Sequence, residues 1–361
     1  MLPALRDRLR ELCDIDAVSG DERPLLRFLR TALAGRVDEF QIDVAGNAYA
    51  VRRGPAPGPT VLIAAHTDEI GLMVKSIEPG GFLRFEKIGG VIDSLLPARA
   101  VRVRGVNGVI GMKSGHYQSE AERTQGRKAS DLYIDLGSSS AAEVEALGVR
   151  VGDPVAFVSP LLEIGGQPHL VAGKAIDNRL GCAVLLALAL GEAPAAGTIV
   201  YAFTAQEEVG LKGAKLAAER FCPDLALALD TMPTGDTPDM SEHRDLNVRL
   251  GAGPALQVMA GPGGRANLLH PGVRDFLEEV AGERGVPLQA CTFSGGSNDS
   301  AAMAWAGLGI AAGSLTLPRR YSHSPLELAD LRDAAGALEV LRGVVGRLPA
   351  LPDFTFLPDD A

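Results

Sequence analysis

The sequence predicts an α/β fold, in which a mixed sheet is flanked by helices and a small β-barrel-like domain is inserted. Short continuous apolar runs rich in β-branched residues alternate with longer helix-like runs in most of the chain. Between residues 69 and 163 the helical periodicity disappears, and short β-type runs separated by Gly and Pro replace it. The length of 361 residues allows a large core and two domains.

The first part of the chain predicts one helix, one buried strand and then the insertion. Residues 1–13 place Arg, Asp and Glu among leucines, which indicates an amphipathic helix. The apolar run 60–65 predicts a strand buried on both faces. Within the insertion, the polar segment 119–129 indicates a loop or mobile arm. Regular short strands there suggest a barrel or sandwich, with runs at 72–77, 82–88, 100–106, 132–136 and 154–158.

After residue 165 the alternation of strands and helices returns. Strands are predicted at 198–204 and 225–229, and an apolar helix at 180–190. Two amphipathic helices are expected over 270–284 and 328–348. We therefore divide the chain into a main domain of residues 1–68 and 164–361 and an inserted β domain of residues 69–163.

Polar residues follow the predicted buried strands. His66 comes directly after the first strand, Glu207 and Glu208 lie just beyond the second, and Asp230 closes the third. Ligands of open α/β sheets bind outside the carboxyl ends of the strands, so these side chains are expected to form one site. Asp177 precedes the apolar helix and is expected where a loop becomes that helix.

Two more residues complete a set that suits two metal ions. His323 lies in the segment YSHSP, and Asp68 follows His66 by two residues. Two divalent cations about 3.5–4 Å apart need about three protein ligands each and one shared carboxylate. Each residue also has an ordinary structural explanation, such as a helix N-cap at Asp177. Their joint occurrence predicts the metal site.

Five motifs carry a family resemblance that extends over nearly the whole chain. They read HTDEIG from His66, GKAIDNR from Gly173, QEEVG from Gln206, GDTP from Gly235 and RYSHSP from Arg320. With these motifs the chain resembles the tetrahedral (TET-type) aminopeptidases of the glutamyl-aminopeptidase-like di-metal peptidase family. The resemblance implies a zinc-peptidase-like catalytic domain and removal of N-terminal residues from peptides by a metal-activated water.

The resemblance also implies a role for each site residue and a mode of assembly. Asp177 would bridge two metal ions, with Zn²⁺ or Co²⁺ expected and Mn²⁺ compatible. The remaining roles are ligation of one ion by His66 and Asp230, ligation of the other by Glu208 and His323, general base catalysis by Glu207, and orientation of His66 by Asp68. The inserted domain would form dimers, and the dimers would assemble into a dodecamer.

Physical arguments support two of these roles separately. Adjacent Glu207 and Glu208 cannot easily both bind one ion, so one of them is free to accept a proton from water. A carboxylate two residues beyond His66 suits the fixing of an imidazole tautomer.

The sequence departs from the family pattern at two places. Asn298, in the loop GGSND from Gly295, stands where relatives usually carry Thr. Ser114 and Gly115 replace a pair of prolines before His116. The first departure concerns the shape of the substrate pocket, and the second concerns only the insertion.

Composition limits the environment of the protein. A net charge of −10 disfavours nucleic-acid binding, and no apolar run is long enough to span a membrane. The four cysteines form no Cys-x-x-Cys pair and are expected to be buried thiols in a reducing compartment, which predicts a cytoplasmic protein: Cys13, Cys182, Cys222 and Cys291.

Other functions remain open at this point. A related di-zinc carboxypeptidase or N-acyl deacylase would not require a free α-amine on its substrate. A glycosidase would need two carboxylates and no metal, which the two histidines argue against. A non-enzymatic assembly protein would be expected to have lost ligands, and none is lost. The preferred N-terminal residue is also open, although Arg265, Arg319 and Arg320 are candidates for binding an acidic one.

Overall fold

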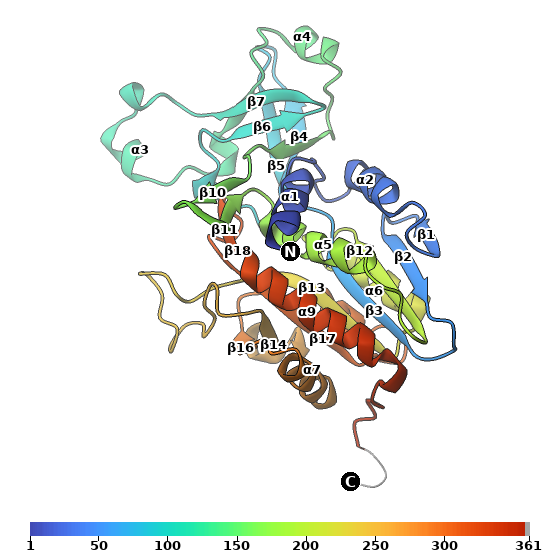
Figure 1. Ribbon diagram of the computed structural model, residues 1–361. Helices are drawn as coiled ribbons and strands as arrows, with labels where there is room; N and C mark the ends of the chain where they lie inside the picture. The colour runs from blue at the N-terminus through green and yellow to red at the C-terminus, as the bar shows by residue number, and fades with distance from the viewer. Residues whose placement is uncertain (358–361) are drawn as a thin grey trace.

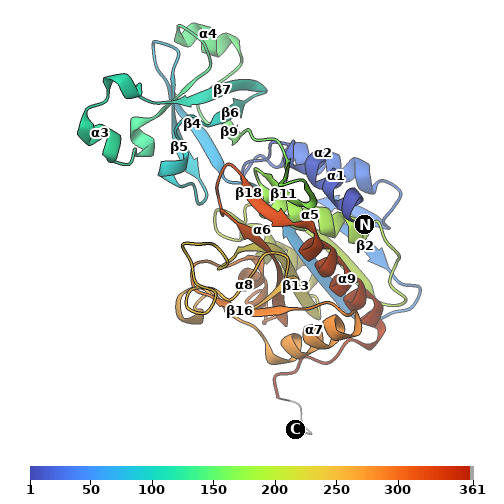
Figure 2. The same ribbon diagram turned by 60° about the vertical axis from the view of Figure 1, so that its left-hand side comes forward.

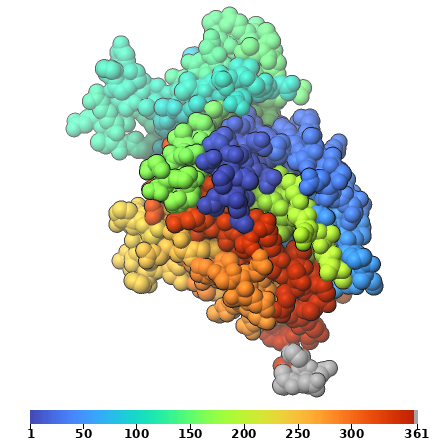
Figure 3. All heavy atoms as spheres, in the orientation of Figure 1, coloured from blue at the N-terminus to red at the C-terminus, as the bar shows by residue number. Residues whose placement is uncertain are grey.

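The computed structural model describes residues 1–357, which form a large mixed sheet flanked by helices and a closed barrel projecting from one end (Figures 1, 2 and 3). This confirms the predicted fold class. The main path of the twelve-stranded sheet follows the order β1 (Glu39–Ile42), β2 (Ala48–Arg53), β12 (Thr198–Thr204), β3 (Thr60–His66), β13 (Leu225–Pro233), β17 (Ala312–Arg320), β18 (Glu327–Asp330), β11 (Gln167–Gly173) and β10 (Leu162–Ile164). Three strands extend it beside β17: β14 (Ala255–Ala260), β15 (Asn267–Leu268) and β16 (Gln289–Phe293).

Helices cover both faces of this sheet, which explains the continuous apolar runs of its central strands. Val61 and Ile63 of β3 pack in one hydrophobic cluster, and Leu62 and Ala64 pack in another. The first cluster contains residues from α1 (Leu2–Cys13), α2 (Arg23–Leu33), α5 (Ile176–Ala189), α7 (Pro271–Glu283) and α9 (Leu331–Arg347). The second contains residues from α6 (Lys212–Phe221) and α8 (Asp299–Ala304). In Figure 1, α1, α5 and α9 lie together on the near face.

The barrel is the structure formed by most of the insertion, and it has its own hydrophobic cluster. Its strands close in the order β4 (Gly71–Ile77), β5 (Leu83–Ile88), β8 (Tyr133–Asp135), β7 (Val106–Gly111), β6 (Ala100–Val103) and β9 (Pro154–Phe157). Two short helices lie outside the barrel wall, α3 (Glu120–Thr124) and α4 (Ala141–Ala146). The polar arm around α3 is thus a loop with one helical turn, which begins at a capping box of Ser119 and Glu122.

Three details differ from the predictions. The predicted run 100–106 is not one strand. It contains β6, a turn at Arg104 and Gly105 with φ of 48° and 81°, and the first residue of β7. The strand that follows, β7, is absent from the predicted set. Residues 327–330 form a strand rather than the start of a helix, since the Asp330 carboxylate accepts a hydrogen bond from Arg332 N (2.9 Å) and caps α9 there.

The third difference concerns the cysteines. Cys13, Cys182 and Cys291 are buried as predicted, but Cys222 is exposed. It ends α6 in a left-handed conformation with φ of 42°, and this capping position lies at the surface. Within residues 1–357, none of the helices has both the length and the apolar character needed to cross a membrane.

Candidate metal centre

The site lies at one edge of the large sheet. Strands β3, β12 and β13 are parallel in register, so their carboxyl ends meet at the same edge. His66 is the last residue of β3 and pairs with Thr204, the last residue of β12, just before Glu207 and Glu208. Asp230 was expected to close its strand, but β13 continues to Pro233 alongside β17.

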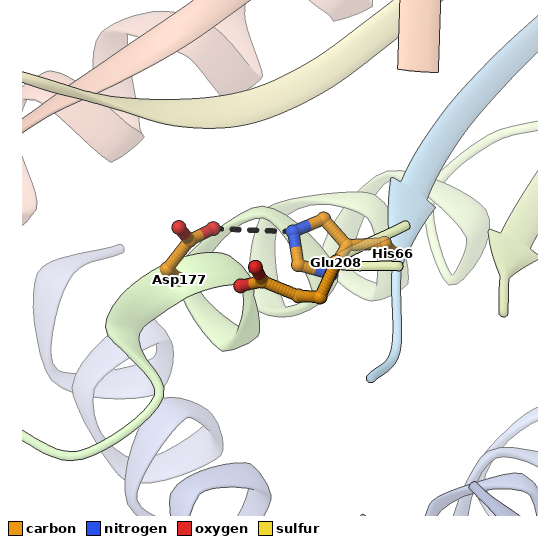
Figure 4. A group of neighbouring side chains, drawn as sticks. All are labelled: His66, Asp177 and Glu208. Carbon is orange, nitrogen blue, oxygen red and sulfur yellow. Dashed lines mark hydrogen bonds and ion pairs between the residues drawn. The ribbon is translucent and has the colours of Figure 1, made fainter. Parts of the chain in front are cut away.

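Asp177 is free to join the site because its neighbour Asn178 supplies the helix cap. The Asn178 side chain accepts a hydrogen bond from Gly181 N (3.0 Å) and donates one to the Leu229 carbonyl (2.8 Å). Asp177 and Asn178 have non-helical backbone angles at the start of α5. The N-cap explanation therefore applies to Asn178, whereas the Asp177 carboxylate points toward the His66 ring (Figure 4).

The five candidate ligands form two groups that share Asp177. On one side, His66 Nε2 lies 3.1 Å from Asp177 Oδ1 and 3.6 Å from Asp230 Oδ1. On the other side, His323 Nε2 lies 3.4 Å from both Asp177 Oδ2 and Glu208 Oε1. Single donor atoms of His66, Asp177 and Glu208 also lie within 4.8 Å of one another (Figure 4). The two oxygens of Asp177 thus face different histidines.

Backbone carbonyls orient both imidazole rings. His66 Nδ1 lies 3.1 Å from the carbonyl oxygen of Asp68 and 3.5 Å from its carboxylate. His323 Nδ1 lies 3.1 Å from the carbonyl oxygen of Gly90, which belongs to the insertion. With Nδ1 engaged in this way, each ring presents Nε2 to the carboxylates.

Sequence reasoning missed Gly90. A Cβ atom at this position would lie 2.5 Å from His323 Nδ1, so only glycine allows the turn after β5 to approach the ring. The neighbouring Gly89 approaches the Glu208 side chain in the same way, with a Cβ at 3.2 Å. The Gly-Gly pair at 89 and 90 was the available signal.

Asp68 is completely buried and holds the loop that carries the two glutamates. Its carboxylate accepts hydrogen bonds from Ser19 Oγ (2.6 Å), Glu207 N (3.0 Å) and Glu208 N (3.2 Å). The contact predicted from sequence, between its carboxylate and His66, is the longer one. Asp68 therefore fixes the backbone of Glu207 and Glu208 at least as firmly as it orients His66.

Burial and neighbouring charges shift the acidity of the site residues. Burial raises the pKa of Glu207, and the carboxylates of Asp230, Asp299 and Glu208 raise it further, so that it lies well above its usual range. Burial also raises the pKa of Asp230 to about 6. The pKa of Asp177 is well below its usual range, because Arg319 and the two histidines outweigh the effect of burial. The pKa of Glu207 is thus shifted upward, whereas that of Asp177 is shifted downward.

The two arginines beside His323 are engaged by acidic residues. Arg319 is buried and donates hydrogen bonds to Asp177 Oδ2, Glu327 Oε1 (2.6 Å) and Thr231 Oγ1 (2.6 Å). Arg320 donates to both carboxylate oxygens of Asp236, at 3.1 and 2.7 Å. Arg265, the third candidate for an acidic pocket, is exposed in a turn. Neither Arg319 nor Arg320 is free to bind an acidic substrate side chain.

The two departures from the family pattern lie outside the ligand set. Asn298 is 4% exposed, caps α8 through Ser300 N (3.1 Å) and donates to Gln257 Oε1 (2.7 Å), so its polar atoms are used inside the protein. The adjacent Asp299 accepts a hydrogen bond from Thr204 Oγ1 (2.5 Å). Ser114 and Gly115 are exposed and precede the arm of the insertion.

The charge of the site fits bound cations. Arg319 is the only arginine or lysine in residues 1–357 that pairs with any of seven carboxyl groups gathered here, those of Asp68, Asp177, Glu207, Glu208, Asp230, Asp299 and Glu327. Buried charges are usually paired or coordinate metals. Imidazole nitrogens and carboxylate oxygens converging on a buried, strongly negative centre are the donor set of a divalent metal site.

Comparisons with known proteins identify the family of this chain. The sequence profile of the M42 glutamyl aminopeptidase family matches residues 46–340. A putative aminopeptidase of Acetivibrio thermocellus is 37% identical over 335 residues, which cover 93% of this chain and 96% of the relative. The lysyl aminopeptidase of Pyrococcus furiosus is 32% identical over 356 residues, which cover 96% of this chain and 98% of the relative.

Solved structures extend the similarity to the whole fold. An aminopeptidase of the archaeon Desulfurococcus kamchatkensis superposes with a TM-score of 0.91 at 35% identity, over 97% of this chain and 96% of the other. The TET1 peptidase of Pyrococcus horikoshii, which can assemble into a tetrahedron or a large octahedral shell, gives a TM-score of 0.83 at 27% identity, over 95% of this chain and 100% of the other. The chain therefore belongs to the M42 glutamyl aminopeptidase family and is a hydrolase that acts on peptide bonds.

Proposed function

We propose that this protein is a co-catalytic aminopeptidase, which uses two divalent metal ions to remove N-terminal residues from peptides. The observation that carries the proposal is the position of Asp177. Its Oδ1 faces His66 and its Oδ2 faces His323, and each histidine has a second carboxylate beside it. A carboxylate shared between two such groups suits a pair of metal ions rather than one.

In this proposal the ligands divide as the geometry suggests. His66 and Asp230 hold one ion, Glu208 and His323 hold the other, and Asp177 is shared. Bound divalent ions would act as Lewis acids on the scissile carbonyl and lower the pKa of water. Zn²⁺ and Co²⁺ suit imidazole and carboxylate ligands, and Mn²⁺ is also compatible.

Glu207 is the proposed general base. Because it is adjacent to the candidate ligand Glu208 but is not assigned as a ligand itself, it would be free to take a proton from the attacking water and pass it to the departing amine. Asp68 supports this role, because it holds the backbone N–H groups of Glu207 and Glu208. The backbone position of Glu207 is thus supported by a residue that is itself buried and hydrogen-bonded.

Electrostatics favour the amino end of a peptide as substrate. With two divalent ions bound, the seven carboxylates would still outnumber the positive charges of the ions and of Arg319, so the site would attract a positively charged α-amino group and repel a C-terminal carboxylate. This supports an aminopeptidase over a carboxypeptidase. The paired states of Arg319 and Arg320 give no support for a preference for acidic N-terminal residues.

Replacement of Glu207 tests the proposed division of roles. We expect Glu207→Gln to retain both metal ions while hydrolysis of aminoacyl chromogenic substrates falls about 10²–10⁴-fold, since a general base is lost but no ligand. Metal content by mass spectrometry and kcat measured on the same sample decide the result. Glu219→Gln, an exposed change in the next helix, is the matched control. Loss of a metal ion from Glu207→Gln would make Glu207 a ligand instead.

The same assay identifies the substrate class. An aminopeptidase should cleave peptides with a free α-amine and leave their N-acetylated forms intact. Cleavage of the acetylated peptides at the N-terminal acyl bond would indicate a deacylase, and release of C-terminal residues would indicate a carboxypeptidase.

We further propose that residues 69–163 act as an inserted domain for assembly, through dimers that build a dodecamer. The closed barrel has its own hydrophobic cluster. Of nineteen exposed large apolar side chains in the described part of the chain, eight lie in this segment, more than its share of the length. The similar TET1 peptidase of Pyrococcus horikoshii can assemble into a tetrahedron or a large octahedral shell, which supports the proposal.

A further inference from the structure

Arg319 is a buried cation held at three points. It lies at the end of β17 and is 3% exposed. Nε donates to Thr231 Oγ1 (2.6 Å), Nη1 to Glu327 Oε1 (2.6 Å), and Nη2 to Asp177 Oδ2. A guanidinium with its three nitrogens engaged in this way has no freedom to swing away from Asp177.

Glu327 connects this arginine to the backbone of two candidate ligands. Its carboxylate accepts hydrogen bonds from Asp177 N (3.0 Å) and from His323 N (2.7 Å), in addition to the one from Arg319. Glu327 is 2% exposed. The pair of Arg319 and Glu327 therefore positions Asp177 and His323 while contributing no ligand.

The position of Arg319 makes the two halves of the site electrically unequal. It donates to Oδ2 of Asp177, the oxygen that faces His323, and leaves Oδ1 to His66. A fixed positive charge beside Oδ2 weakens the attraction of the His323 half of the site for a cation. Two other buried cations lie nearby, Lys174, which lines a pocket with Glu208 and His323, and Arg179, but both pair with Glu69 instead of a candidate ligand.

Two effects of Arg319 on metal affinity oppose each other. Loss of a residue that supports a ligand typically lowers metal affinity about 10–100-fold. Repulsion between a guanidinium and a divalent ion separated by a single carboxylate exceeds that effect even with the high effective dielectric of proteins. The charge of Arg319 therefore affects the metal affinity more than the support that its hydrogen bonds give to Asp177.

We propose that Arg319 keeps the metal position formed by Glu208 and His323 the weaker and more exchangeable of the two. The inference rests on the proposed two-metal function. It assigns Arg319 as a positioning residue whose charge sets the difference in affinity between the two metal positions, with Glu327 holding it in place.

The test is calorimetric titration of the full-length, metal-depleted protein with Co²⁺. The wild type is expected to bind two ions with unequal affinity. In Arg319→Gln the weaker position should bind about tenfold or more tightly, because the charge is removed and one hydrogen-bond donor is kept. Arg319→Lys, which keeps the charge but not the fork of donors, should retain the inequality. A gain in affinity is a result that loss of a purely structural residue would not produce.

A second comparison keeps the inference testable if Arg319→Gln leaves Glu327 unpaired and misfolds. The double variant Arg319→Gln/Glu327→Gln replaces the ion pair by two amides, and Glu327→Gln alone is its reference. The double variant should bind the weaker ion about tenfold more tightly than the reference.

Several outcomes would overturn the inference. These are equal affinities in the wild type, an unchanged or weaker second position in Arg319→Gln, and a double variant no tighter than its reference. Binding of fewer than two ions by the wild type would refute the proposed function, and the inference with it. Two ions without the expected gain would refute the inference alone.

Discussion

Asp177 makes the two halves of the site depend on one another, because each of its oxygens faces a different histidine. A shared carboxylate also screens the repulsion between two cations a few ångströms apart. His323 Nε2, in contrast, lies beside the carboxylates of Asp177 and Glu208, in one half of the site. Replacement of these two residues should therefore have different effects on metal content.

We expect Asp177→Ala to release both metal ions, whereas His323→Ala should mainly weaken the ion that Glu208 also holds. Metal content per subunit, measured by native mass spectrometry after gel filtration, distinguishes the two results. Asp275→Ala, an exposed change in α7, should keep both ions. Two full equivalents in Asp177→Ala would show that this carboxylate is not shared.

At the residue level, the sequence was informative where a side chain follows a strand. His66, Glu208 and Asp230 could be placed together because parallel strands end at one edge of a sheet. The contacts of Arg319 and Glu327 could not be predicted, because they depend on tertiary packing that leaves no local sequence pattern. For Gly90 the one local signal was the Gly-Gly pair at 89 and 90. From sequence, Arg319 is a candidate for the substrate pocket, but in the fold its guanidinium is buried and donates a hydrogen bond to Asp177.

The turn after β5 is the element that joins the barrel to the site. Gly89 and Gly90 bring the backbone of this turn against Glu208 and His323, and the Gly90 carbonyl lies 3.1 Å from His323 Nδ1. None of the ligands predicted from the sequence lies in the insertion, residues 69–163. The structure shows that it supports the orientation of one histidine.

Gly90→Ala should disturb that histidine selectively. The added Cβ would lie 2.5 Å from His323 Nδ1 and 2.7 Å from Cε1, so the ring must move. We expect affinity for the metal ion near His323 to fall about 10–100-fold, with a matching loss of kcat/KM, while the other ion stays bound. Titration of the metal-depleted protein with Co²⁺ measures both affinities.

The control for this substitution lies in the same insertion. An added Cβ at Gly115 would meet no atom within 4 Å, so Gly115→Ala should match the wild type. Wild-type metal affinity in Gly90→Ala would show that the turn does not hold the ring.

Helices and strands could be predicted where a single apolar pattern, either continuous or periodic, extends over the whole element. The strands β3 and β12 and the helix α7 follow continuous or periodic apolar patterns, and they appear where expected. The hairpin at Arg104 and Gly105 was missed, although Gly105 is a turn signal between the two strands. The helix predicted from 328 begins late, since Asp330 acts as a cap within an otherwise continuous pattern.

For the whole molecule, the closure of the barrel limits how subunits can associate through it. The strands of the barrel form a closed ring, and only short stretches of edge remain, such as the part of β5 beyond its single pair with β8. Contacts through the insertion are therefore expected to use mainly exposed side chains. Tyr117, which is 80% exposed, and Val151, which is 61% exposed, are among the apolar ones available there. Substitution of these exposed apolar side chains can therefore test the assembly proposal.

We expect the full-length protein to form a closed oligomer, because closed symmetric assemblies are the usual outcome for soluble homo-oligomers. Twelve copies of the 37.7 kDa chain would give a mass of about 450 kDa by light scattering. A variant with residues 72–156 replaced by a short glycine linker should form a much smaller species. A short linker can join the two ends of the deletion because Leu72 and Val155 are paired neighbours on β4 and β9. Glu69 lies outside the deleted segment, so it keeps its buried contacts with Lys174 and Arg179.

The deletion also removes the Gly90 contact with His323. The oligomeric state of the deletion variant is therefore the relevant measurement, and its activity is not. Circular dichroism must show that the large sheet is still folded.

Tyr117→Glu/Val151→Glu in the full-length chain provides a second test that leaves the barrel core and Gly90 in place. If the assembly uses this surface, two buried carboxylates would cost far more than the contacts they replace, and the mass should fall. A full-length protein that is strictly monomeric yet fully active on short peptides would refute the assembly proposal and leave the metal site unaffected.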